Sequence, residues 1–372
     1  MKILIENIAI YTESLNREFI DKGYLYIDKG LIIAVGEGMP PPELEFADYI
    51  IDGKYAVALP GFAVGIGNIV DYMLRFKSLA NRKEDILTTL SLSDIQTLAS
   101  VALASLVLNG VTSIVTYVNP LNTKILSGIA MAANECWVRV RMLIPIDGLD
   151  VQTVEDLIKS ALKSIKEPDA SVKGVITFGF YAKKQVSKEF LDLAKSLNVK
   201  LYIEGILANN ELLIQNPEDI IVISQRPTIV PSNIKKVVIN NINQWKKGLG
   251  YISHDPLNLN PRNIIYSISK AFDNPRTILD ILCHFNPINL GIGTKSIEEG
   301  NIADIILLDY SKPPVGPIPI TEIDIVNEIS MLNYVVETVL VAGELTLDQG
   351  LTLNIGDKHI KKAQSIIENL KH

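Results

Sequence analysis

A change of rhythm at Pro60 constrains the fold of this chain more than any other feature. From there to about residue 254, short apolar runs rich in β-branched residues alternate with stretches of helical periodicity. For example, a helix is predicted to begin at Ser91 and to end before Asn109-Gly110, and a strand is predicted over residues 111–118. Alternation of this kind gives a parallel sheet with right-handed crossovers. About eight units over roughly 240 residues suit a closed (β/α)8 barrel, an α/β fold whose usual length is about 250 residues.

Both ends of the chain are predicted to be rich in β-strands. The expected strands cover residues 2–11, 23–28, 31–35, 47–51, 55–59, 302–309, 335–342 and 351–353. Asp28-Lys29-Gly30 and Asp52-Gly53 each predict a hairpin turn, because glycine accepts a positive φ. The N-terminal strands are too few to be stable alone, so they need a partner sheet. The last predicted element is a helix over residues 357–370.

Composition and charge exclude several classes of protein. The 372 residues are 48% hydrophobic and 21% charged, which is typical of a globular chain. The net charge of −7 argues against a nucleic-acid partner. Asn109-Gly110 interrupts the one long uncharged stretch, so no membrane span is predicted, and the N-terminal residues lack the apolar run of a signal peptide. We therefore expect a cytoplasmic protein with two buried thiols, Cys136 and Cys283.

The stretch Leu59–Arg75 carries a resemblance to a known enzyme family. It reads L-P-G-F-A-V-G-I-G-N-I-V-D-Y-M-L-R. This resembles the first barrel strand of the amidohydrolase superfamily, most closely the branch of cytosine deaminase-like and chlorohydrolase-like enzymes. That strand reads roughly P-G-F-V-N-x-H-x-H and is followed by an arginine. The residues that match the pattern are Pro60, Gly61, Phe62 and Arg75.

The resemblance extends over nearly the whole chain. Residues 106–115 (L-V-L-N-G-V-T-S-I-V) are similar to the family's strand entry E-L-x-x-G-T-T-T, and residues 293–309 to its segment G-S-I-E-x-G-K-x-A-D-L-V-L-L-D. Residues 132–140 and 336–345 match two further segments. The resemblance implies a TIM-like barrel over residues 58–300, a small β-sandwich that both chain ends build from residues 1–57 and 301–356, and a C-terminal helix over residues 357–372.

The resemblance also implies where a metal site would lie. Active members hold one or two divalent metals at the C-terminal ends of the barrel strands, and metal-bound water attacks a C–N or similar bond. The two histidines of the first strand are replaced by Ile66, which cannot coordinate, and Asn68, whose amide oxygen is a poor ligand for zinc. Glu204 stands at a later ligand position and Asp255 at the position of the catalytic aspartate. No histidine precedes His254, so the next ligand has no candidate.

Glu204 and Asp255 are therefore the candidate catalytic residues. If the two carboxylates face each other, they can share a proton or hold a hard cation such as Mg²⁺ or Ca²⁺. The candidates for binding substrate are Asn68, Arg75, Tyr117 and His254. Arg75 can bind an anionic group or pair with Asp71, four positions earlier on a helix. His254 and Asp255 are strand neighbours, which face opposite sides of a regular strand.

Three functional hypotheses follow. The first is an amidohydrolase-superfamily homologue with a degenerate metal site, impaired in catalysis, that binds a small molecule. The second is an active C–N hydrolase or deaminase in which Asp255 is the general base and Glu204 a ligand or acid, with an unusual metal or none. The third is a non-catalytic interaction subunit. A divalent metal (zinc, iron or manganese) is expected only if the site is active, and the sequence leaves a homo-oligomer open.

Overall fold

Eight parallel strands close into a barrel, as the alternating pattern predicts. The computed structural model of the protein describes residues 1–14, 18–76, 79, 82–165, 174–205, 217–227, 234–253, 261–313, 315–319 and 321–370. The barrel strands are β6 (Phe62–Asn68), β7 (Val111–Tyr117), β8 (Arg139–Pro145), β9 (Ile176–Ala182), β10 (Lys200–Glu204), β11 (Ile220–Ser224), β12 (Val237–Ile239) and β13 (Gly250–Ser253). Strand β13 pairs with β6, which completes the circle. The predicted (β/α)8 barrel is confirmed.

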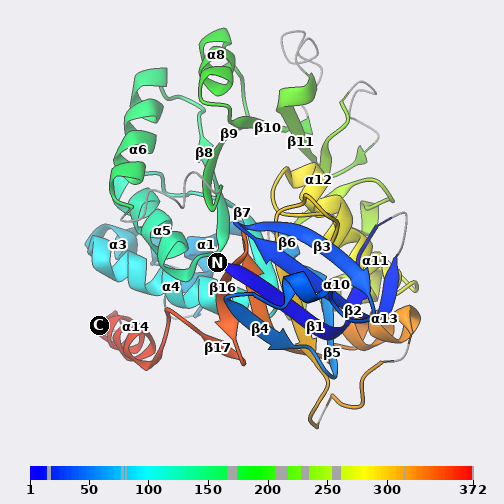
Figure 1. Ribbon diagram of the computed structural model, residues 1–372. Helices are drawn as coiled ribbons and strands as arrows, with labels where there is room; N and C mark the ends of the chain where they lie inside the picture. The colour runs from blue at the N-terminus through cyan, green and yellow to red at the C-terminus, as the bar shows by residue number, and fades with distance from the viewer. Residues whose placement is uncertain are drawn as a thin grey trace.

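Helices surround the barrel and cover its strands (Figure 1). The described helices are α1 (Ile69–Met73), α3 (Lys83–Thr89), α4 (Leu92–Val107), α5 (Thr123–Cys136), α6 (Val151–Lys163), α8 (Lys188–Ser196), α10 (Pro261–Ala271), α11 (Arg276–Leu279), a π-helix (Asp280–Phe285), α12 (Asn286–Leu290), α13 (Glu322–Ser330) and α14 (Asp357–Asn369). Ser91 caps α4 as predicted, and Asp94 completes a capping box with it. The C-terminal helix α14 packs against α4.

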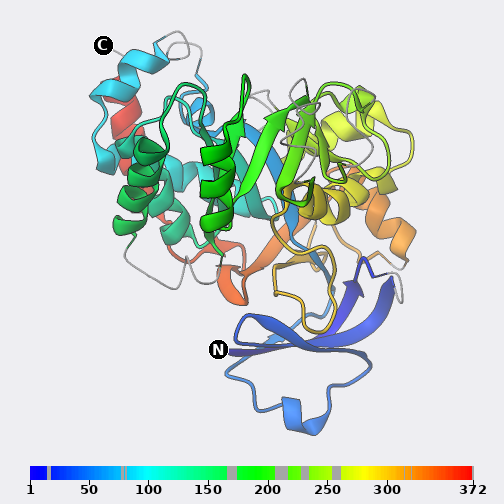
Figure 2. The ribbon, with the colours of Figure 1, turned by 90° about the horizontal axis from the view of Figure 1, so that it is seen from above.

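The two ends of the chain build one nine-stranded sheet beside the barrel (Figure 2). Its strands are β1 (Lys2–Tyr11), β2 (Phe19–Asp28), β3 (Leu31–Glu37), β4 (Tyr49–Asp52), β5 (Ala56–Pro60), β14 (Ile305–Asp309), β15 (Val335–Val341), β16 (Glu344–Asp348) and β17 (Leu351–Thr352). The strand order is β17-β16-β15-β14-β5-β1-β2-β3, and β4 pairs with β1. Strand β5 is antiparallel to β14, so it joins the N-terminal strands to the C-terminal ones.

One of the two predicted hairpins is wrong. The hairpin at Asp28-Lys29-Gly30 is confirmed, since β2 and β3 pair antiparallel and both Lys29 and Gly30 have positive φ. Asp52-Gly53 does not reverse the chain, and β4 and β5 do not pair with each other. Both run parallel to β1 and occupy different parts of it. The Asp-Gly signal therefore marks a short break between two segments that run in the same direction along β1, and not a hairpin.

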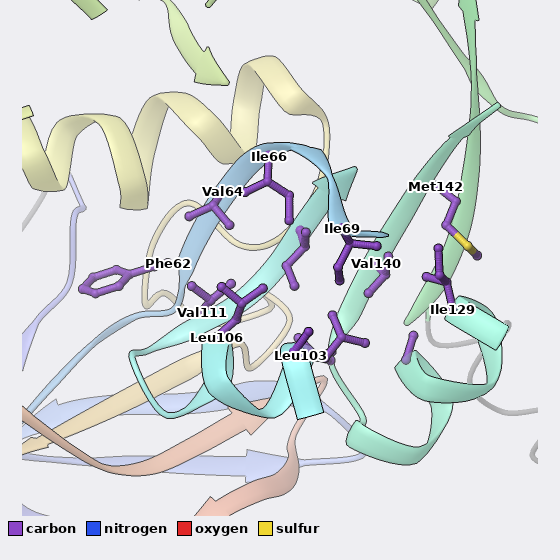
Figure 3. Close-up of a cluster of buried hydrophobic side chains, with 14 of the residues drawn as sticks. Phe62, Val64, Ile66, Ile69, Leu103, Leu106, Val111, Ile129, Val140 and Met142 are labelled. Atoms are coloured by element: carbon purple, nitrogen blue, oxygen red, sulfur yellow. The ribbon is translucent and has the colours of Figure 1, made fainter. Parts of the chain in front are cut away.

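Side chains of the barrel strands alternate between two apolar clusters. The lumen cluster consists of Val115, Tyr117, Leu143, Tyr181, Tyr202, Ile221, Ile223, Val238, Ile252, Leu290 and Ile292. The outer cluster lies between the barrel and its helices, and Figure 3 shows Val64 and Ile66 of β6 in it beside Leu103 and Leu106 of α4. Because successive side chains of a strand point to opposite faces, the two neighbours of an inward-facing residue face outward.

Cys136 and Cys283 are both free and buried, as predicted. Of the helices in the described ranges, none has the length and apolar character that crossing a membrane requires.

Candidate functional site

Three candidate residues lie at the C-terminal end of the barrel strands. Asn68 ends β6, Tyr117 ends β7 and Glu204 ends β10. A fourth side chain, Tyr181 of β9, joins them. We call these four residues the mouth group. In TIM barrels this end of the strands carries the active site, so the mouth group is the candidate functional site.

Glu204 is held by a tyrosine. The hydroxyl of Tyr181 donates a hydrogen bond to Oε1 of Glu204. The rings of Tyr181 and Tyr117 meet edge to face, with 4.5 Å between their centroids. Burial, with the nearby Glu204 carboxylate, raises the pKa of both phenols. Both tyrosines therefore keep their protons at neutral pH, and the Tyr181 hydroxyl donates to Glu204.

The end of β6 is organised by Thr116 of the neighbouring strand. Thr116 Oγ1 donates to the carbonyl of Gly67 (2.8 Å) and accepts from the amide of Ile69 (3.0 Å). The pairing of β6 with β7 is irregular between Ile66 and Asn68. The side-chain amide nitrogen of Asn68 donates to the carbonyl of Asn119 in the segment after β7. Asn68 thus joins two strand ends.

Ile66 faces away from the lumen. It is fully buried in the outer cluster (Figure 3). Its neighbour Gly65 is the residue that faces inward, because a Cβ on Gly65 would lie 2.8 Å from the side chain of Ile252 in the lumen cluster. Ile66, which the sequence resemblance placed at the first histidine of the family motif, therefore points into the helix layer.

The mouth group does not fit the metal centre that the fold implies. Zinc in proteins takes three or four strong nitrogen, sulfur or carboxylate ligands. Ile66 points outward, Asn68 offers an amide, and Glu204 is engaged by Tyr181. Within the described ranges, no three histidine, cysteine or carboxylate side chains come together as a metal site. His254 and Asp255 lie outside the described residues, so their predicted roles stay predictions.

Arg75 lies apart from the mouth group. It belongs to a groove of about 240 Å³ between α1, α4 and α14. Its guanidinium stacks on the rings of Tyr72 (4.3 Å) and Phe76 (4.9 Å), and Nη1 donates to the carbonyl of Tyr72 at 3.0 Å. The structure therefore brings together Asn68, Tyr117 and Glu204, but it does not bring Arg75 to them.

Tyr181 is the member of the mouth group that the sequence did not indicate. The alternating pattern favours a strand over residues 172–180, which ends before Tyr181, whereas β9 is observed over Ile176–Ala182. Residues 172 and 173 lie outside the described residues. Thr177, Gly179 and Tyr181 alternate along β9, and this parity would have placed Tyr181 inward had the strand end been known.

Comparisons with known proteins give short sequence matches and long structural ones. No protein-family model matches the chain. It is 50% identical over 62 residues to 5-methylthioadenosine/S-adenosylhomocysteine deaminase of Syntrophomonas wolfei, which is 17% of this chain and 14% of that enzyme. It is 33% identical over 75 residues to the enzyme of the same name from Halalkalibacterium halodurans, which is 20% of this chain and 17% of that enzyme. Each match thus spans less than a fifth of the relative.

Solved structures match over almost the full length. The zinc complex of atrazine chlorohydrolase from Arthrobacter aurescens has a TM-score of 0.73 at 14% identity, over 98% of this chain and all of that one. An amidohydrolase from Brucella melitensis gives 0.72 at 13% identity, over 98% and 99%. A zinc-bound adenosine deaminase from Xanthomonas campestris gives 0.70 at 12% identity, over 99% and 98%. At such identities the likeness concerns the fold.

Proposed function

The chain has the fold of the amidohydrolase superfamily, and we propose that its barrel mouth binds a small molecule without running the superfamily's metal-water hydrolysis at a normal rate. The outward orientation of Ile66 carries this proposal. A ligand position that faces the helix layer cannot be restored by a small shift of a side chain, because successive strand residues point to opposite faces.

The mouth group favours a ligand with an aromatic body and N–H or O–H donors. A carboxylate has two oxygens, and Tyr181 uses Oε1 of Glu204, so Oε2 remains to accept a hydrogen bond from a ligand. Tyr117 and Tyr181 offer ring surface beside that carboxylate. An adenine-type heterocycle with an exocyclic amino group has this combination of features.

A substitution of Glu204 tests the proposal. Glu204→Gln keeps the shape of the side chain and removes its charge. We expect it to weaken the binding of 5-methylthioadenosine about ten- to a hundredfold, because a hydrogen bond to a charged group is worth about 1.5–3 kcal/mol. Isothermal titration calorimetry measures this change. The matched control is Glu218→Gln, an exposed glutamate at the other end of the barrel strands, which should leave the affinity unchanged.

The same proteins test for turnover. We expect ammonia release from 5-methylthioadenosine to stay at the background rate for the wild type and for Glu204→Gln, with or without added zinc or manganese. A wild-type protein that does not bind the compound would refute the proposed ligand class. Turnover that is present in the wild type and in Glu218→Gln but absent from Glu204→Gln would refute the proposed loss of catalysis.

A second candidate is an active deaminase or C–N hydrolase. The stretch that is half identical to a 5-methylthioadenosine/S-adenosylhomocysteine deaminase favours it. In this alternative Asp255 is the general base and Glu204 the acid or ligand. The turnover experiment separates the two candidates, since only the second expects Glu204 and Asp255 to be required for ammonia release.

A further inference from the structure

An ion cluster occupies the junction between the terminal sheet and the barrel. Its centre is Arg276 of α11, whose guanidinium lies over the ring of Tyr11 with 5.4 Å to the centroid. The four carboxylates that surround this one arginine are Glu13, Glu18, Asp280 and Glu322. They come from the connection between β1 and β2, from the π-helix and from α13. We call this group, with His284, the Arg276 cluster.

Glu13 is the buried member of the Arg276 cluster. Its side chain is 5% exposed, whereas that of Glu18 is 39% exposed. Oε1 of Glu13 lies 3.7 Å from Nη2 of Arg276 and has no hydrogen-bond partner, and Oε2 lies 4.0 Å from Nδ1 of His284. A buried carboxylate oxygen without a donor is costly when charged. Glu13 therefore favours its neutral, protonated form.

Two unusual backbone conformations converge on this cluster. Glu13 has a φ of 56°, in the left-handed region that non-glycine residues seldom adopt. Asp280, Cys283 and His284 belong to a π-helix, a conformation that is rare and frequent at functional sites. The surrounding structure has to hold both conformations in place, and both serve to bring Glu13 and His284 within 4.0 Å.

Burial, more than the surrounding charges, opposes the ionisation of Glu13. Burial raises its pKa from 4.5 to about 7, Arg276 and the Tyr11 hydroxyl act against this shift, and the negative charges of Asp280 and Glu18 add to it. On the facing elements, burial raises the pKa of Tyr11 and Cys283, so both stay neutral. Burial lowers the pKa of His284, with Lys295 and Lys247 acting in the same direction and Asp280 against. His284 therefore does not supply a compensating positive charge near pH 7.

We propose that Glu13 is the proton-sensing group of a latch that fastens residues 12–14, which follow β1, to α11 and the π-helix. With its proton, Glu13 is accommodated beside His284 and the latch is closed. Without its proton, Glu13 becomes a fourth anion beside one arginine that three other carboxylates already share. Residues 12–14 then separate from the helices. The exposed Glu18 and Glu322 remain with Arg276 in either state.

The elements that form the latch contact the chain just before the first barrel strand. Strand β1 pairs with β5 through Ala9 and Ile10, and β5 leads directly into β6. Cys283 of the π-helix contacts the carbonyl of Pro60, at the point where β5 meets β6 (3.5 Å). The π-helix that carries His284 thus also contacts the chain just before the first barrel strand. This inference rests on the junction and not on the proposed function of the mouth.

Hydrogen exchange tests the latch in the full chain. Two backbone hydrogen bonds report on the segment that follows β1. They run from Thr12 N–H to Glu18 O and from Ile297 N–H to Thr12 O, both 2.8 Å. A carboxyl whose folded pKa is raised destabilises the closed state as pH rises from about 4.5 to 7. After correction for the chemical exchange rate, we expect protection of these amides to fall about tenfold between pH 6.0 and 8.5.

Three variants assign the effect to Glu13. Glu13→Gln is neutral at every pH and should keep the same protection at pH 6.0 and 8.5. Glu18→Gln and His284→Gln should keep the wild-type pH dependence, since neither removes the sensing carboxyl. Wild-type protection that does not change with pH would overturn the proposal, and so would an unchanged pH dependence in Glu13→Gln. Loss of the pH dependence in His284→Gln alone would also overturn it, because the imidazole would then be the sensor.

Discussion

Replacing Arg139 by methionine is expected to lower the free energy of unfolding by about 3–5 kcal/mol, the range for breaking a buried ion pair by removing one partner. Arg139 begins β8 and is 5% exposed, and its partner Asp304 is fully buried ahead of β14. Nε and Nη2 of Arg139 donate to the two oxygens of Asp304 at 3.0 and 2.8 Å. Methionine fills much of the same volume but leaves the Asp304 carboxylate buried without a cation.

The same ion pair ties the sheet to the barrel. Nη1 of Arg139 also donates to the carbonyl of Gly174 (2.8 Å), and Asp304 accepts from the amide of Ala342 after β15 (2.7 Å). The substitution therefore weakens the junction of β8 with the C-terminal strands as well as the pair itself.

Urea denaturation followed by tryptophan fluorescence measures this loss. The control is Lys235→Met, which removes an exposed pair with Glu218 at 3.1 Å and should change stability by less than about 0.5 kcal/mol. If Arg139→Met were as stable as the control, the junction would not depend on the buried pair. The double variant Arg139→Met/Asp304→Leu should recover much of the loss, because an apolar pair of similar volume leaves no buried charge unpaired.

Replacing Ile66 by histidine is expected to lower the free energy of unfolding by about 2–4 kcal/mol without creating a zinc site. Ile66 lies among aliphatic side chains of the outer cluster, to which Leu103 and Leu106 of α4 also belong (Figure 3). An imidazole there leaves two buried ring nitrogens without partners and loses the packing of the isoleucine. Zinc titration of the variant, together with its urea denaturation, measures both effects.

Asn68→His is the matched variant for Ile66→His. It changes the other position of the same motif, at the mouth, where the bond from Asn68 to the carbonyl of Asn119 is lost. We expect it to cost about 1 kcal/mol. Tight zinc binding by the double variant Ile66→His/Asn68→His at wild-type stability would contradict the account, because it would require residue 66 to face the lumen.

The barrel was predictable because its signals are local. Each strand and helix between β6 and β13 shows its own periodicity, and caps such as Ser91 and breakers such as Asn109-Gly110 set the boundaries. The pairing of β4 and β5 with β1 was not predictable from the same signals. It depends on which strands meet in space, and the break at Asp52-Gly53 separates two strands that run in the same direction.

The site was only partly predictable for a related reason. Glu204 and Tyr117 follow from strand ends, which the sequence located well. Tyr181 was missed because the end of β9 was placed too early. Arg75 was chosen by its spacing from β6, but α1 intervenes and directs it into the groove beside α14. Spacing along the chain does not determine direction once a helix turns between two positions.

The metal content of the purified protein tests the central claim most directly. The protein is prepared without chelator and without an affinity tag, incubated with zinc, iron or manganese, desalted and measured by elemental mass spectrometry. With Ile66 turned outward and Asn68 bound to Asn119, the account predicts far less than one metal per chain, and no difference between the wild type and Glu204→Ala. Close to one metal per chain, lost in Glu204→Ala, would contradict it and make the mouth a metal centre.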